Sequence, residues 1–354
     1  ISVRKKSAAM YLLEDNEATT TGAKVNNLGD ISLGKGSIGI YYSDKDKNGN
    51  VFTGSNPNTV GGAYNLKNIL SSSENVIGMY FNSDNMAATN NKKYINEATG
   101  LIQLLGEHSI GMFAEGNGNY LTENKGRIIL GNASSLTNAN IGIFSKNEKT
   151  LIKNSGSITG GKNTVGLYGY QITTTNTSKI TVGDSGVGVY SSKGDLDLDG
   201  DLEIGAKEAK GVYLVGNSAQ NVAYKFSKFT LGDDSFGLVN KGKNKTITST
   251  TNKVDLNNRN MFMYSEDNLG SITNYTKLKS KGNGNYGIYS VGAVTNYGDI
   301  DFRKGKGNVG LYSANKNKTV KNAGNIYVGA SQPREHYSIG MAGGYYNTDT
   351  NTLV

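Results

Sequence analysis

The tetrapeptide Ile38-Gly39-Ile40-Tyr41 recurs along the whole 354-residue chain. Most copies have an aliphatic residue, a glycine, a second aliphatic residue and an aromatic residue. Two degenerate copies have Ala9 and Phe262 at the glycine position. A repeat that runs along a whole chain decides its architecture, because each copy is one structural unit that stacks on the next. The glycines of the other copies are Gly39, Gly78, Gly111, Gly142, Gly166, Gly188, Gly211, Gly237, Gly287, Gly310 and Gly340.

A second motif lies between consecutive tetrapeptides and begins with asparagine, as in Asn27-Leu28-Gly29-Asp30-Ile31. In nine of the twelve intervals an asparagine stands four residues before an apolar residue of the following strand, as Asn27 stands before Ile31. We call this apolar residue the apolar anchor. One asparagine at the same place in every repeat predicts a ladder of stacked side-chain amides. These asparagines are Asn27, Asn65, Asn124, Asn154, Asn176, Asn252, Asn274, Asn296 and Asn322.

The spacing of the tetrapeptides predicts the fold. Consecutive glycine positions are 22 to 39 residues apart, and a coil of three short strands and three turns needs about 22 residues. The Ile-x-Val segments alternate as half-buried strands do, and no amphipathic helix is evident. We therefore predict an all-β chain that forms a right-handed parallel β-helix of about twelve coils, as one domain over residues 1–354. Some connections between strands are longer than a coil requires, and we call these long loops excursions.

The tetrapeptide also predicts an outward aromatic stripe. Because side chains alternate along a strand, Ile38 and Ile40 would face one way, and Gly39 and Tyr41 the other. Such a stripe could stack on sugar rings. Alternatively, the aromatic residue could pack under a neighbouring long loop, or a bulge could turn it inward. Packing is favoured because four copies have a residue without a hydroxyl at this position, namely Phe113, Phe144, Val239 and Ala342.

Composition and charge exclude several classes of protein. The chain has no cysteine, which excludes disulfides and thiolate metal sites. Its net charge of +8 comes from scattered lysines, so a nucleic-acid partner is not expected. The segment Gly183-Asp184-Ser185-Gly186 resembles the surroundings of a catalytic serine, but it falls in a turn of the repeat and lacks a nearby histidine. We expect no enzyme.

Three connections are longer than the repeat requires: residues 43–61, 82–93 and 330–338. Loops on a rigid scaffold are common binding sites, although a solenoid also accepts extra length at little cost. The first and third excursions therefore supply the candidate ligand-binding residues. These are Asp44, Asp46, Asn48, Asn50, Gln332, Arg334, Glu335, His336 and Tyr337.

The first excursion also carries a candidate calcium site. Asp44, Asp46, Asn48 and Asn50 match the first half of a calcium-binding loop, with oxygen ligands at alternate positions and glycine at the sixth. Residues 195–202 match the same pattern, but there the repeat explains the aspartates as outward residues of a strand. Both segments lack the acidic residue at position twelve. Calcium is thus the one candidate cofactor, and no other is expected.

The Asn-x-Gly-x-Ile and Val-Gly-Ile-Tyr-Ser repeats, with spacers rich in lysine and asparagine, resemble the passenger domains of very large type V autotransporter adhesins of fusobacteria. That resemblance implies a passenger segment of a longer chain, exported and displayed on the bacterial surface. It also implies a signal peptide and a C-terminal outer-membrane barrel that lie outside this segment.

The resemblance further implies a cell-surface adhesin that binds a host-cell protein receptor or glycan, and partner bacteria, through loops on a rigid β-helix. One alternative is a structural stalk that displays a distal binding head. The other is a glycan-processing enzyme built on a β-helix.

Overall fold

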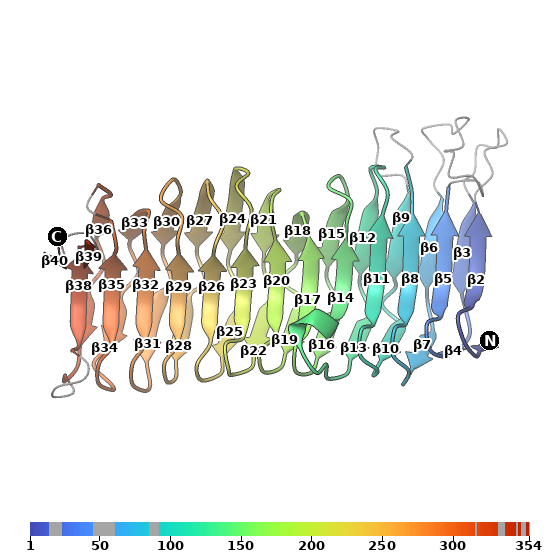
Figure 1. The fold of residues 1–354 in the computed structure, drawn as a ribbon, viewed down its shortest axis with the longest axis horizontal. Coiled ribbons are helices and arrows are strands. Elements are labelled where there is room, and N and C mark those ends of the chain that lie inside the picture. The colour runs from blue at the N-terminus through green and yellow to red at the C-terminus, as the bar shows by residue number, and fades with distance from the viewer. Residues whose placement is uncertain are drawn as a thin grey trace. The chain divides into compact units, whose positions relative to one another are not determined.

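The computed structural model describes residues 1–13, 23–44, 61–84, 92–315, 317–331 and 337–344, together with the backbone of Tyr346–Asn347 and Thr352–Leu353. Almost all described residues with regular structure are in strands, and one short 3-10 helix covers Leu136–Asn138. The chain divides into two compact units, Ile1–Val182 and Gly183–Val354. Each coil contributes three short strands to parallel sheets, which confirms the predicted parallel β-helix of about twelve coils (Figure 1).

Unit 1 contains three parallel sheets. Sheet A1 comprises β1 (Ser2–Val3), β4 (Ile31–Leu33), β7 (Asn68–Ser71), β10 (Leu101–Leu104), β13 (Arg127–Leu130), β16 (Ser157–Gly160) and β19 (Lys179–Val182). Sheet B1 comprises β2 (Ala8–Leu13), β5 (Ile38–Ser43), β8 (Ile77–Asn82), β11 (Ile110–Glu115), β14 (Asn140–Ser145) and β17 (Thr164–Gly169). Sheet C1 comprises β3 (Lys24–Asn27), β6 (Gly62–Asn65), β9 (Lys93–Asn96), β12 (Leu121–Asn124), β15 (Leu151–Asn154) and β18 (Gln171–Thr174).

Unit 2 repeats this arrangement. Sheet B2 comprises β20 (Val187–Ser191), β23 (Lys210–Leu214), β26 (Phe236–Asn240), β29 (Met261–Ser265), β32 (Tyr286–Ser290), β35 (Val309–Ser313) and β38 (Ile339–Gly343). Sheet C2 comprises β21 (Leu196–Leu198), β24 (Gln220–Tyr224), β27 (Lys245–Ser249), β30 (Ser271–Asn274), β33 (Ala293–Asn296) and β36 (Val320–Asn322). The third side has the pair β22 (Asp201–Ile204) and β25 (Lys228–Leu231), and the sheet of β28 (Lys253–Leu256), β31 (Lys277–Ser280), β34 (Ile300–Phe302) and β37 (Ile326–Val328). A short antiparallel pair, β39 (Tyr346–Asn347) and β40 (Thr352–Leu353), ends the described chain.

The core is a stack of aliphatic side chains inside the coils. Equivalent residues of successive coils pair in register, as Ile102 pairs with Ile69 and with Ile128, and all three are fully buried. Burying this apolar surface in every coil is the main stabilising contribution, at roughly 25 cal/mol per Å². Among the described residues, no helix has the length and apolar content needed to cross a bilayer.

The predicted alternation in the tetrapeptide is wrong at the glycine. The coil-to-coil register pairs Ile110 with Ile77 and Met112 with Met79, but it leaves out Gly111. A Cβ on Gly111 would lie 2.9 Å from Cγ2 of the buried Ile128, so the glycine faces inward beside Met112. The first aliphatic residue and the aromatic residue therefore both face outward. A local departure from the regular strand at glycine explains this arrangement, because glycine allows the chain to approach a neighbour closely.

Replacing Gly111 with alanine should destabilise unit 1 by about 1–3 kcal/mol, because the new methyl group overpacks the core. The added Cβ would lie 2.5 Å from the carbonyl oxygen of Gly142 in the next coil. Urea denaturation followed by circular dichroism measures the effect. Gly29→Ala is the matched control, since no atom lies within 4 Å of the Cβ added there. Equal stability of the two variants would show that close packing does not explain the glycine.

The predicted amide ladder is confirmed in both units, with corrections. In unit 1, Asn27, Asn65, Asn96, Asn124 and Asn154 donate from one Nδ2 to the next Oδ1 at 2.8 Å. In unit 2, Asn274, Asn296 and Asn322 do the same at 2.7 Å.

Two predicted ladder members are wrong and one real member was missed. Asn176 and Asn252 are exposed, because the ladder position in their coils belongs to Thr174 and Ser249. Asn96 is a ladder residue although it stands six residues before Ile102, since its turn is two residues longer than the others. The spacing to the apolar anchor is therefore a weaker guide than the pairing register of the coils.

Candidate functional site

The outward faces of sheets B1 and B2 carry a ladder of aromatic rings. In unit 1 the ring of Tyr41 stacks on Tyr11 at 4.8 Å and on Tyr80 at 5.0 Å, and the ladder continues through Phe113, Phe144 and Tyr168. The rings contact one another along the row, face to face at Tyr11–Tyr41–Tyr80 and at Phe113–Phe144, and edge to face at Tyr80–Phe113. Contacts between neighbouring rings are therefore sufficient to account for this row without a ligand.

In unit 2 the aromatic ladder is interrupted. Tyr264 stacks on Tyr289 at 5.1 Å, and Tyr289 stacks on Tyr312 at 5.3 Å. Val239 takes the aromatic position between Tyr213 and Tyr264. The hydroxyl of Tyr264 donates to Glu266 at 2.6 Å, and burial together with this carboxylate raises the pKa of Tyr264.

A second outward row in these sheets is formed by the first residue of each tetrapeptide, and its composition differs between the two units. In sheet B1 it is aliphatic, with Ile38, Ile77, Ile110 and Ile141 paired in register. In sheet B2 the same position holds Lys210, Phe236, Met261 and Tyr286 in four consecutive coils. All four side chains are half-buried. The repeat does not require these residues, because Val187 and Val309 occupy the equivalent position elsewhere in unit 2.

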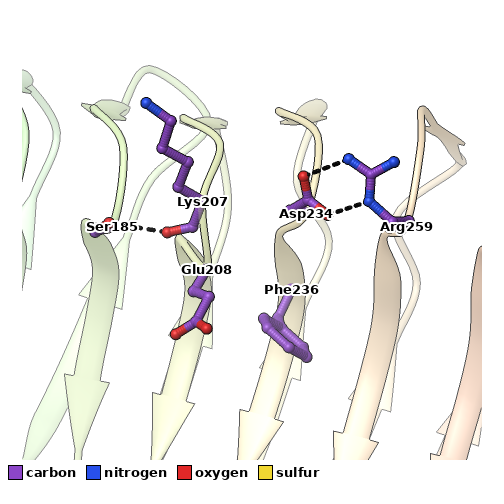
Figure 2. Close-up of a pocket in the computed structure, with 6 residues that line it drawn as sticks. All are labelled: Ser185, Lys207, Glu208, Asp234, Phe236 and Arg259. Atoms are coloured by element: carbon purple, nitrogen blue, oxygen red, sulfur yellow. Dashed lines mark hydrogen bonds and ion pairs between the residues drawn. The ribbon is translucent and has the colours of Figure 1, made fainter.

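A groove of about 600 Å³ lies beside this row in unit 2. Figure 2 shows that its lining residues come from neighbouring coils: Phe236 begins strand β26, and the other five lie on the turns that precede strands of sheet B2. It is lined by Ser185, Lys207, Glu208, Asp234, Phe236 and Arg259.

The backbone at the groove is unusual. Five of its six residues have left-handed φ values of 51° to 65°, which non-glycine residues adopt only in tightly constrained turns. The amide of Asp234 donates to the carbonyl of Asn258 at 3.0 Å, and that of Arg259 to Asn283 at 2.8 Å. These coil-to-coil bonds fix the turns, and with them the start of each side chain.

Charged groups in the groove are largely paired with one another. The guanidinium of Arg259 donates from Nη2 to Oδ2 of Asp234 at 2.7 Å and from Nε to Oδ1, and these bonds hold the pKa of Asp234 below its ordinary value. Lys207 Nζ lies 3.2 Å from Oδ2 of Asp184. Lys210 Nζ lies 5.9 Å from the centroid of the Phe236 ring, and burial lowers the pKa of Lys210. The groove therefore combines one aromatic ring with polar groups of little net charge.

No family model, no curated protein and no solved structure matches this chain. The resemblance to autotransporter passengers thus rests on the repeat motifs alone and stays a prediction.

Most of the predicted ligand-binding residues lie outside the described residues. These are Asp46, Asn48, Asn50, Gln332, Arg334, Glu335 and His336. Of the remaining two, Tyr337 is 71% exposed, whereas Asp44 is 1% exposed. The binding role of both excursions stays a prediction.

Asp44 has partners within the protein. Its Oδ2 accepts a hydrogen bond from Ser83 Oγ at 2.6 Å and lies 3.1 Å from Lys92 Nζ, and its Oδ1 accepts from the amide of Asp84 at 3.0 Å. Lys92 is 6% exposed. A calcium ion at Asp44 would have to compete with this ammonium group, so the calcium hypothesis stays a prediction that depends on rearrangement here.

In the second calcium-like segment, residues 195–202, the leucines face inward and the aspartates outward, as the repeat predicts. Leu198 and Leu202 are fully buried, while Asp195 accepts hydrogen bonds from the amide and the side chain of Asn221. Across the part of the chain that the structure describes, no three acidic or histidine side chains converge to hold a metal ion.

The serine of the protease-like segment, Ser185, donates a hydrogen bond to the carbonyl of Lys207 at 2.9 Å within the turn.

Two features of the surface were not predicted. One is the groove. The other is a pair of tyrosines, Tyr275 and Tyr297, which stack at 4.8 Å and are 49% and 45% exposed. The pair could have been found in the sequence, because both tyrosines directly follow a ladder asparagine. The groove could have been found by aligning the first residue of each tetrapeptide and asking where aliphatic residues are replaced.

Proposed function

We propose that this chain is a non-enzymatic adhesin segment that binds its partners through the side of a β-helix. The observation that carries the proposal is the outward row of sheet B2. There the aliphatic residue of the repeat is replaced by Lys210, Phe236, Met261 and Tyr286, next to the groove, while the inward residues Val212, Leu238 and Met263 remain apolar and buried. Partly exposed aromatic and charged residues that a fold does not require are typical of binding surfaces.

The groove favours binding over catalysis. A general base needs a carboxylate that readily takes up a proton near neutral pH. Asp234 is instead held ionised by the guanidinium of Arg259. The pair can still orient a bound hydroxyl or amide through its remaining lone pairs and N–H groups.

The motif resemblance extends this proposal to place and partners. Display on the bacterial surface, with anchoring through a C-terminal outer-membrane barrel, fits a long repeat with lysine-rich spacers. The partners we propose are a host-cell receptor or glycan, and partner bacteria. The two excursions remain candidate contact sites in addition to the groove.

A stalk is the second candidate function, and the regularity of unit 1 favours it. Its amide ladder runs from Asn27 to Asn154, and its aromatic ladder runs from Tyr11 to Tyr168, without interruption. Such uniform stacking makes a stiff support and offers no distinct site.

Binding of the fluorescently labelled chain to epithelial cells and to co-aggregating bacteria tests the adhesin proposal. We expect saturable binding to at least one of them. Deleting residues 45–57 or 332–336 then shows whether the excursions contribute. A wild-type chain that binds neither kind of cell contradicts the adhesin proposal and leaves the stalk.

A further inference from the structure

The groove of unit 2 offers the chemistry that recognises a neutral sugar. We propose that it is a saccharide subsite, in which a pyranose ring lies against the ring of Phe236 and its hydroxyls bond to Asp234, Arg259 and Glu208 (Figure 2). The inference rests on the proposed adhesive function and names the class of ligand for this surface.

Size and shape fit a small polar ligand. The volume of about 600 Å³ falls within the range of small-molecule sites, roughly 300–1,000 Å³. The lining residues come from neighbouring coils, so one residue of a longer saccharide could occupy the groove while the rest follows the surface.

Phe236 supplies the apolar surface. Its side chain is half-buried at the first outward position of β26, where Val187 and Val309 show that an aliphatic side chain is sufficient for the fold. The face of a pyranose carries C–H groups with partial positive charge, and the face of an aromatic ring is negative. Stacking of the two needs neither a charge on the ligand nor a change in the protein.

The polar groups are suited to hydroxyls. Asp234 and Arg259 form a planar, two-bond pair at one side of the groove, and Glu208 is exposed on the neighbouring coil. Carboxylate oxygens accept hydrogen bonds from hydroxyls, and guanidinium N–H groups donate to them. Pairing in advance keeps these groups in place before the ligand arrives, which lowers the entropy cost of binding.

The pattern of charge argues against an acidic ligand. Arg259 is neutralised by Asp234, and Lys207 lies against Asp184. Lys210 donates to the carbonyl of Glu208 at 2.7 Å and is half-buried. The two cations that line the groove, Lys207 and Arg259, are thus already balanced by carboxylates, so an acidic ligand would gain less from them than from cations without such partners. A neutral saccharide is the ligand that fits.

Binding of the full 354-residue chain to a glycan array of neutral, sialylated and sulfated oligosaccharides, followed by saturation-transfer NMR with the strongest ligand, tests the proposal. We expect a neutral oligosaccharide to bind the wild-type chain. Phe236→Val, which restores the residue type of the repeat, should weaken binding roughly tenfold, as expected for loss of one stacked ring. Arg259→Gln should also weaken it, since glutamine has only two of the five N–H donors of the guanidinium group and no charge.

The matched control is Tyr312→Val, which also replaces a half-buried outward ring of sheet B2 with valine, three coils from Phe236 and outside the groove, in the row where Val239 shows that valine is accepted. Its affinity should stay within about twofold of wild type, and thermal melting checks that all variants are folded. The proposal is overturned if no neutral saccharide binds, if only acidic glycans bind, or if Phe236→Val binds as wild type does.

The outcome also separates this inference from the adhesin proposal. A wild-type chain that adheres to cells but binds no saccharide contradicts the saccharide subsite and leaves adhesion intact. A chain that binds a neutral saccharide but adheres to no cell supports the subsite and contradicts the adhesin proposal.

Discussion

Replacing Lys92 with methionine should lower the free energy of unfolding of unit 1 by about 3–5 kcal/mol, as measured by urea denaturation. The ammonium of Lys92 lies 3.1 Å from Oδ2 of Asp44, and both side chains are buried. Removing the cation leaves a carboxylate with little contact with water. Ser83 and the amide of Asp84 still donate to this carboxylate, but the ammonium that balanced its charge is gone, and a buried charge without its counter-charge is costly.

The surroundings make this loss large. Tyr42, Phe81, Tyr94 and Tyr120 are all fully buried around the pair, and the ring of Tyr94 packs on Phe81 at 4.0 Å. The pKa of Tyr94 is raised well above its ordinary value because burial disfavours its charged form, and nearby Asp44 contributes to the rise. The same low polarity acts on the carboxylate of Asp44 when Lys92 is replaced.

Two variants make this prediction specific. Lys35→Met removes the cation of an exposed pair with Glu74 and should leave stability almost unchanged, because water screens this pair. The double variant Asp44→Leu with Lys92→Met removes both charges and should recover most of the loss. If Lys92→Met costs no more than Lys35→Met, the pair is not isolated from water as we describe.

Replacing Asn124 with alanine should cost about 2–4 kcal/mol, the second-largest effect we expect. The fully buried Asn124 donates to Asn154 and accepts from Asn96, both at 2.8 Å. Alanine would deprive the Nδ2 donor of Asn96 and the Oδ1 acceptor of Asn154 of this partner. Each buried group that loses its hydrogen bond costs about 1–3 kcal/mol. Urea denaturation of unit 1 measures the loss.

Asn176→Ala is the control for the ladder. Asn176 has the same spacing to its apolar anchor but is exposed, so its loss should change stability by less than about 0.5 kcal/mol. Equal losses for the two variants would mean that stability depends on the residue type and not on the stacked amides.

The fold could be predicted because each coil repeats the same inward residues. Ile69, Ile102 and Ile128 occupy equivalent places, so one correct coil gives the others. Details that depend on contacts between coils could not be predicted in this way. The inward turn of Gly111 is imposed by Ile128 of another sheet, and the position of Asn96 depends on pairing with Asn65 and Asn124.

The site was harder to predict for the same reason. Asp44 has the spacing of a metal ligand, but its surroundings are set by Lys92, which is 48 residues away in the sequence. The groove arises only when Glu208, Asp234 and Arg259 are brought together from neighbouring coils. Motif spacing within one segment does not contain that information. The excursion residues 45–50 and 332–336 lie outside the described residues, so their predicted roles stay predictions.

The central claim is that adhesion depends on the residues of unit 2 that depart from the repeat, and not on the repeat itself. Binding of labelled chains to cells, measured by flow cytometry, tests it most directly with the triple variant Lys210→Val, Phe236→Val and Met261→Val. The control changes Ile77, Ile110 and Ile141 to valine at the equivalent position of sheet B1. We predict that the triple variant loses most of its adhesion while its melting temperature and the adhesion of the control stay unchanged. Undiminished adhesion of a folded triple variant would contradict the account.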